Sequence, residues 1–365
     1  METAAKKGVS RRKVFAVVLL CLTIVQFSLA YGVLSEVYMR PPKPTPVPEE
    51  PKVNVIIRMR DYVMSCVYKV YANPGLGMWL AKVVVTNVGN TSIYDLRISY
   101  RAVGFTDWIS YKTFPMLIPN GTVVDNYYPA FPPTVMERTT RSTVELTVKW
   151  EYKDGLGKLY EDVKTKHFTL LARNELAWCG LPEEEALNWY DWESNYWALA
   201  AFVTPHEPNL NKHASLATRG IPSSITDDAA VKAIVSIYNY MAKWGIRYRT
   251  PTFEELTGIQ SIQYPKDTFD MYAGTCVDTA VALASMCMSV GLNVYIFLLP
   301  GHAIPVIELP ESKNLVPIES TMLGSGSAED AYNSAVKTVK DSMEKGYYIW
   351  VDVSYWQALG VTPPW

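Results

Sequence analysis

A cysteine, a histidine and a glutamate follow one another in the C-terminal half of the sequence, in an order that suits nucleophilic catalysis. Cys276 comes after a Gly-Thr break and opens a run that is apolar on nearly every face up to Val290. Such a run predicts a helix in the middle of a domain. A thiol in the first turn of a helix lies beside unpaired backbone amides and the positive end of the helix dipole, which favour the thiolate. Cys276 is therefore the candidate nucleophile.

The other two candidates lie on short strands that follow Gly291. His302 begins the second of three predicted strands, and Glu319 ends the third. Neighbouring strands lie about 4.8 Å apart, so an imidazole and a carboxylate on adjacent strands can meet. If this sheet packs on the start of the helix, His302 can take the thiol proton while Glu319 fixes the histidine tautomer. Asp352, in the last predicted strand, is the alternative orienting acid.

Two residues near Cys276 are candidates for support. Gln263 lies upstream and is a candidate donor to an oxyanion. Asp278 is one turn into the helix and is expected to cap or orient rather than to react. Taken alone, a cysteine in an apolar helix is more often a small core residue than a nucleophile. The catalytic interpretation therefore depends on the wider pattern around these residues.

Six short segments between residues 175 and 322 supply that pattern. They are AFVTP at 201–205, AIVSIYNYMAKWGIRY at 233–248, QYPKDT at 263–268, GTCVDTA at 274–280, GHA at 301–303 and PIEST at 317–321. In this order they resemble the transglutaminase-like (papain-like cysteine protease) superfamily, in particular its archaeal membrane-associated members. The resemblance implies a cysteine nucleophile, a histidine base and an orienting acid, which places these roles on Cys276, His302 and Glu319.

Three positions depart from the family's pattern. Thr275 stands where an acid usually precedes the nucleophile, Ile304 where an aromatic residue often follows the His-Ala pair, and Glu319 where Asp is commoner. None of them removes a reacting group, although Thr275 can alter thiol activation.

The resemblance predicts acyl transfer through a thioester, as a cysteine peptidase or amidase or as a transglutaminase-like acyltransferase. Hydrolysis of a peptide or amide bond is favoured, because water needs no second binding site. The alternative is a catalytically inactive transglutaminase-like domain that serves as a cell-surface binding or structural module.

Composition limits the partners and cofactors. The five cysteines, at 21, 66, 179, 276 and 287, have no zinc-ligand spacing, so neither a metal nor another cofactor is expected. A disulfide between Cys66 and Cys179 is a possibility that the sequence does not require. A formal net charge of −2 gives no field that would attract nucleic acid. The expected partner is a peptide or protein substrate at the cell surface.

The N-terminal segment is predicted to be a membrane anchor. Residues 14–34 are 21 positions without a charge, long enough to cross a bilayer, and residues 1–13 form a basic tail. The positive charge predicts a cytoplasmic N-terminus and an extracellular body on a single-pass anchor. Cleavage after Ala30, as in a signal peptide, is the alternative. Residues 41–51 hold six prolines and predict an extended spacer.

The remaining chain predicts a multidomain fold. Residues 52–172 alternate and are rich in Val, Thr and Tyr, which predicts an immunoglobulin-like β-sandwich with a hairpin turn at 153–158. Residues 175–365 predict an α+β domain of papain-like, transglutaminase-like type. Its expected helices include 183–203 and one that begins at 226–228.

Overall fold

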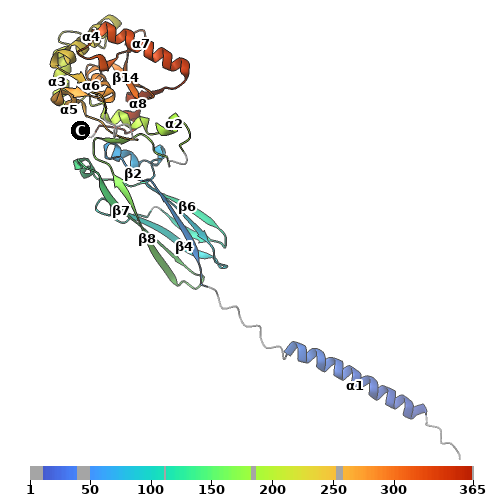
Figure 1. Cartoon of the computed structure of the whole chain (residues 1–365). Helices are drawn as coiled ribbons and strands as arrows, with labels where there is room; N and C mark the ends of the chain where they lie inside the picture. Colours follow the sequence, from blue (N-terminus) through green and yellow to red (C-terminus); the bar gives the residue numbers. More distant parts are fainter. Residues whose placement is uncertain (1–10, 39–49, 111, 182–185, 252–257, 364–365) are drawn as a thin grey trace, which may run out of the picture. The chain divides into compact units, whose positions relative to one another are not determined.

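The computed structural model of this chain describes residues 11–38, 50–110, 112–181, 186–251 and 258–363 (Figure 1). The chain divides into two units, Met1–Glu50 and Pro51–Trp365. The first unit contains α1 (Arg11–Tyr38). Within the described residues it is the one helix long and apolar enough to cross a membrane, and it includes the predicted span 14–34. The predicted spacer, 41–51, lies almost entirely outside the described residues.

Two β-sheets form the N-terminal part of the second unit (Figure 1). The larger has the strand order β2-β8-β7-β4-β5 and the smaller β1-β3-β6, and neighbours are antiparallel except for β2 and β8. The strands are β1 (Val53–Met59), β2 (Tyr62–Val63), β3 (Ala81–Asn87), β4 (Ile93–Ala102), β5 (Thr113–Leu117), β6 (Thr122–Tyr127), β7 (Ser142–Lys153) and β8 (Leu159–Leu170).

The two sheets share a core that their alternating sequences provide. Every second residue of β3 is buried, as the apolar alternation predicts. Tyr100 of β4 stacks on Tyr127 of β6 with ring centroids 4.7 Å apart, and its hydroxyl donates to Asp125 at 3.0 Å. The predicted turn at 153–158 is confirmed as the connection of β7 to β8, where Asp154 accepts from two backbone amides. This part is therefore a folded β-structure, as the sequence indicates.

Helices and a second group of strands form the C-terminal part. The α-helices are α2 (Trp189–Trp192), α3 (Pro208–Ala217), α4 (Asp227–Trp244), α5 (Pro265–Met271), α6 (Cys276–Ser289), α7 (Ala328–Lys345) and α8 (Val353–Ala358). The strands are β9 (Glu175–Ala177), β10 (Arg247–Tyr248), β11 (Ile259–Ser261), β12 (Ala273–Gly274), β13 (Asn293–Leu299), β14 (His302–Glu308), β15 (Leu315–Pro317) and β16 (Ile349–Asp352). Short 3-10 helices are η1 (Ser65–Ala72), η2 (Pro74–Leu76), η3 (Pro133–Glu137), η5 (Tyr196–Phe202) and η7 (Ser320–Met322).

Helix α6 is the centre of this part, and it packs against β13 and β14 (Figure 1). All residues from Cys276 to Cys287 are buried, which is what a helix apolar on every face requires. The sheet beside it is antiparallel with the order β15-β14-β13-β16. The expected helix from Cys276 and the three strands after Gly291 are therefore confirmed, but the third strand ends at Pro317, so Glu319 does not end it and is instead the N-cap of η7.

One expectation is wrong, and one possibility that the sequence left open is not realised. Over the described residues, 183–203 forms no single helix but the short α2 and the 3-10 helix η5. Asn188 starts α2 with a capping box to Asp191, and Asn195 interrupts the helix to donate to the Ala177 carbonyl at 2.9 Å. No disulfide joins Cys66 and Cys179, because each thiol is free and bonded to backbone carbonyls instead.

The predicted boundary near residues 172–175 stays a prediction. Residues 51–365 cluster as one compact unit. Contacts cross the proposed boundary: the Arg60 guanidinium donates to the Gly180 carbonyl at 3.0 Å, and the Lys69 ammonium donates to the Thr362 hydroxyl at 2.9 Å. The β-rich part and the helical part therefore share structural support.

Candidate active site

Cys276 lies at the first position of α6, where a capping box fixes the helix start. Thr275 is the N-cap, and its hydroxyl and backbone N–H both donate to Asp278 Oδ2, at 3.0 and 2.8 Å. The amides of the first turn are thereby oriented before any ligand arrives. Cys276 itself is 7% exposed, at the wall of a pocket of about 310 Å³. The thiol is thus held at a helix N-terminus with access to a ligand.

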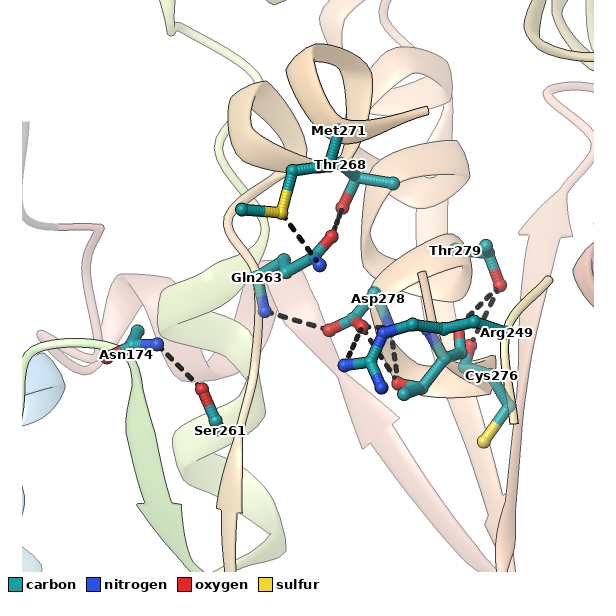
Figure 2. Close-up of polar contacts among 10 residues, drawn as sticks. Asn174, Arg249, Ser261, Gln263, Thr268, Met271, Cys276, Asp278 and Thr279 are labelled. Carbon is teal, nitrogen blue, oxygen red and sulfur yellow. Dashed lines mark hydrogen bonds and ion pairs between the residues drawn. The ribbon is translucent and has the colours of Figure 1, made fainter. Parts of the chain in front are cut away.

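Asp278 ties a second segment to the same helix start. Its other oxygen accepts the backbone N–H of Gln263 at 2.8 Å, and the Arg249 guanidinium lies 3.9 Å from Oδ2 (Figure 2). Gly274 permits this approach, because a Cβ there would lie 2.6 Å from the Asp278 Cβ. Asp278 therefore caps and orients, as the sequence indicates, while its side chain is fully buried.

His302 and Glu319 meet as the strand order predicts. His302 begins β14, and its Nε2 lies 2.8 Å from Glu319 Oε2. The other carboxylate oxygen of Glu319 accepts from Thr321, from its backbone N–H at 3.1 Å and from its hydroxyl at 2.6 Å. The Ser320 hydroxyl meets that of Thr279 in α6 at 3.0 Å. Glu319 is therefore fixed against the first turns of α6.

The electrostatics of this pair favour a charged histidine. Burial lowers the pKa of His302, but hydrogen bonds with Cys276 and Glu319 outweigh burial and raise the pKa to about 10. Burial raises the pKa of Glu319, whereas its bonds to His302 and Thr321 lower it, with a net lowered value. At neutral pH the imidazole is therefore an imidazolium that contacts the Glu319 carboxylate.

Two of the sequence candidates do not occupy the predicted places. The side-chain amide of Gln263 contacts Thr268 and Met271, so Gln263 is not the oxyanion donor that the sequence suggested. In Figure 2 that side chain points toward Thr268 and Met271, whereas the Cys276 thiol points away from them. Asp352 lies opposite Tyr295 across β13 and accepts from the Tyr355 amide, as the cap of α8. Glu319, not Asp352, contacts His302.

Three residues of the pocket were not among the candidates predicted from the sequence. Gln260, Trp178 and Glu193 line the pocket that also contains Cys276 and His302. They come from β11, from the residue after β9 and from the end of α2, so only the fold brings them together. Their sequence neighbourhoods carry no motif, apart from the closeness of Gln260 to QYPKDT.

Tyr248 of β10 is also near the reacting groups. Partial burial raises its pKa, and negative charge on Cys276 and Glu319 raises it further. Strand β10 pairs with β12, so Tyr248 lies opposite Gly274, two residues before the thiol. Its hydroxyl therefore stays protonated at neutral pH.

The His302–Glu319 pair makes a testable contribution to stability. The pKa of His302 is about 10 in the folded protein and 6.5 ordinarily, so its contribution is complete below about pH 6.5 and is lost as the pH rises toward 10. The lowered pKa of Glu319 makes its contribution complete above its ordinary 4.5. Glu319→Gln is therefore expected to cost about 2 kcal/mol near pH 6 and clearly less at pH 10. Urea unfolding at both pH values, with exposed Glu329→Gln as control, measures this; an equal cost at both would contradict it.

Within the described part of the chain, no group of three His, Cys, Asp or Glu side chains is placed to hold a metal ion. Comparison with family models and with curated proteins gives no match for this sequence.

Solved structures give three likenesses. A late embryogenesis abundant protein is 17% identical, with a TM-score of 0.22, over 43% of this chain and 89% of its own. A structural-genomics target is 12% identical, with a TM-score of 0.20, over 39% of this chain and 97% of its own. The sporulation control protein Spo0M from Bacillus subtilis is 17% identical, with a TM-score of 0.18, over 33% and 49%. None of the three assigns a family to this chain.

Proposed function

We propose that this chain is a membrane-anchored extracellular thiol enzyme of the transglutaminase-like superfamily, with Cys276, His302 and Glu319 as its catalytic residues. The proposal includes an immunoglobulin-like β-sandwich at 52–172 and hydrolysis of a peptide or amide bond as the reaction. The observation that carries it is the 2.8 Å contact of His302 with Glu319, from a histidine that shares a pocket with a helix-N-terminal cysteine. The long apolar helix α1 supports the anchor.

The proposed reaction has two steps. The Cys276 thiolate attacks the substrate carbonyl, and collapse of the tetrahedral adduct breaks the C–N bond while the His302 imidazolium gives its proton to the leaving amine. A thioester remains on Cys276. His302 then removes a proton from water, which attacks the thioester and releases the carboxylic acid and the Cys276 thiolate, so that the imidazolium–thiolate pair is restored. Glu319 keeps the imidazole oriented and stabilises its charged form throughout.

Gln260 supplies the oxyanion donor in this proposal. Its Oε1 accepts the indole N–H of Trp178 at 3.0 Å, which fixes the amide so that its NH₂ group is the end left to donate. Gln260 is 8% exposed, and it lines the pocket together with Cys276. Buried, pre-oriented donors of this kind stabilise the charge that develops on the carbonyl oxygen.

Gln260→Ala is therefore expected to slow thioester formation by about 100-fold. The variant should leave alkylation of Cys276 by iodoacetamide unchanged, because alkylation forms no oxyanion. Stopped-flow acylation by p-nitrophenyl acetate, compared with the alkylation rate, measures both. A parallel loss of both rates would show that Gln260 only holds the site together.

The proposed function is tested by trapping the acyl-enzyme. The full chain in detergent micelles is treated with p-nitrophenyl acetate and with a library of peptides, and the Cys276 peptide is analysed by mass spectrometry. An acetyl adduct on Cys276, absent from Cys276→Ser and slow in His302→Ala, is expected, together with turnover of some peptides. A protein that forms no adduct and cleaves no peptide would be a binding or structural module instead.

A further inference from the structure

One carboxyl in the pocket takes no part in the thiol chemistry. Glu193 ends α2 and lines the pocket with Cys276 and His302. Its side chain is partly buried, and within the described residues no lysine or arginine forms an ion pair with it.

The surroundings of Glu193 do not compensate for its burial. Burial raises the pKa of its carboxyl to about 7, and the indole of Trp189 only partly opposes this. A carboxyl that is withdrawn from water without a cationic partner is costly, and a cation that enters the pocket relieves that cost. The pocket therefore holds one half of an ion pair.

Two tryptophans complete this side of the pocket. The indole N–H of Trp178 already donates to Gln260, so a ligand in the pocket can contact the ring of Trp178 but not its N–H. Trp192 is 44% exposed although it lies beside the buried acid. Aromatic faces attract ammonium and guanidinium groups, most strongly where water is excluded. A carboxyl with two indoles is a combination suited to an organic cation.

We propose that this pocket binds the ammonium or guanidinium group of a substrate, with Glu193 as counter-ion and Trp178 and Trp192 as the aromatic walls. The inference rests on the proposed function for the reacting atom, Cys276, and adds the chemical class of the substrate. Glu193 is a specificity residue in it, since it contacts the substrate away from the bond that changes.

The test uses thiol reagents that differ in charge. The full chain in micelles at pH 8, where the Glu193 carboxyl is ionised, reacts with methyl methanethiosulfonate, its trimethylammonium-ethyl analogue and its sulfonatoethyl analogue. Rates at Cys276 come from peptide mapping and are divided by those of 2-mercaptoethanol. The cationic reagent is expected to react about fivefold faster than the neutral one, and the anionic reagent more slowly.

Matched variants test whether Glu193 causes the preference for the cationic reagent. Glu193→Gln should bring the ratio of cationic to neutral rates to about one, while Glu193→Asp and the exposed control Glu329→Gln should preserve it. A ratio near one in the unaltered protein, or a ratio unchanged in Glu193→Gln, would overturn the proposal. Near-isosteric Glu193→Gln removes only the charge, and its melting curve reports whether it folds.

A second measurement separates this proposal from the thiol chemistry. In Cys276→Ser, excess Nα-acetyl-lysine amide should raise the melting temperature and Nα-acetyl-norleucine amide, which carries no ammonium group, should not, and Glu193→Gln should abolish the difference. A cation preference here, without any acylation of the unaltered protein, would support the pocket and refute the enzyme. No difference between the two amides would refute the pocket.

Two further experiments determine whether the acyl donor or an amine acceptor carries the cation. If the acyl donor carries it, the p-nitrophenyl ester of 6-aminohexanoate should acylate Cys276 faster than the hexanoate ester. If an amine acceptor carries it, 1,5-diaminopentane should accelerate deacylation of the hexanoyl enzyme. Either effect, lost in Glu193→Gln, supports the proposal, and the absence of both counts against it.

Discussion

Replacing His302 by alanine is expected to slow iodoacetamide alkylation of Cys276 about 300-fold at pH 6. The pKa of His302 is raised to about 10, so the imidazolium is present across the neutral range, and in the proposed site it stabilises a thiolate on Cys276. An ordinary thiol with a pKa of about 8.5 is only about 0.3% ionised at pH 6. Loss of the imidazolium therefore removes most of the reactive thiolate.

The pH profile gives the same prediction in another form. Between pH 6 and pH 9 the alkylation rate of the unaltered protein should change less than about threefold, whereas an ordinary thiol would change about 200-fold. The exposed His167 of β8 provides the control, because His167→Ala should leave the profile unchanged. Peptide mapping of the full chain separates Cys276 from the buried Cys66 and Cys287, whose pKa burial raises to about 12. A steep profile in the unaltered protein would contradict the ion pair.

The sequence predicted well those parts of the site that one element or two adjacent elements determine. Helix α6 was recognisable because apolar residues cover every face of it, and Cys276 stands at its start. His302 and Glu319 were recognisable because they lie at the beginning of β14 and just past the adjacent β15. In such cases strand spacing and helix polarity alone determine which groups can meet.

The sequence did not predict the features that depend on contacts between segments far apart in the chain. Gln263 and Gln260 lie three residues apart, yet their side chains go different ways: that of Gln263 contacts α5, whereas that of Gln260 joins Trp178. The pairing of β11 with β9 settles this, and it is a contact over more than 80 residues between strands of three residues each. Similarly, the helix expected at 183–203 ends early because Asn195 bonds to the Ala177 carbonyl. Periodicity contains no information on such partners.

The burial of Asp278 leads to the largest expected effect on stability. Asp278→Ala removes the acceptor of three hydrogen bonds, from the Gln263 amide and from the Thr275 amide and hydroxyl. No solvent reaches the site, since both Asp278 and Thr275 are fully buried. Donors left unpaired away from water each cost about 1–3 kcal/mol, so a loss of about 3–5 kcal/mol in the free energy of unfolding is expected.

Helix α7 provides a matched comparison within the same chain. Its start has the same capping box, in which Asp330 accepts from the Ser327 amide and hydroxyl, but there both residues are exposed. Water can replace the lost acceptor in Asp330→Ala, so that variant should lose clearly less stability than Asp278→Ala in urea unfolding. Equal losses would mean that the caps act only through local helix geometry. A larger loss at Asp278, with slower alkylation of Cys276 in the folded fraction, would show that this buried carboxyl positions the thiol as well as the helix, because it joins the Gln263 segment to the turn that presents Cys276.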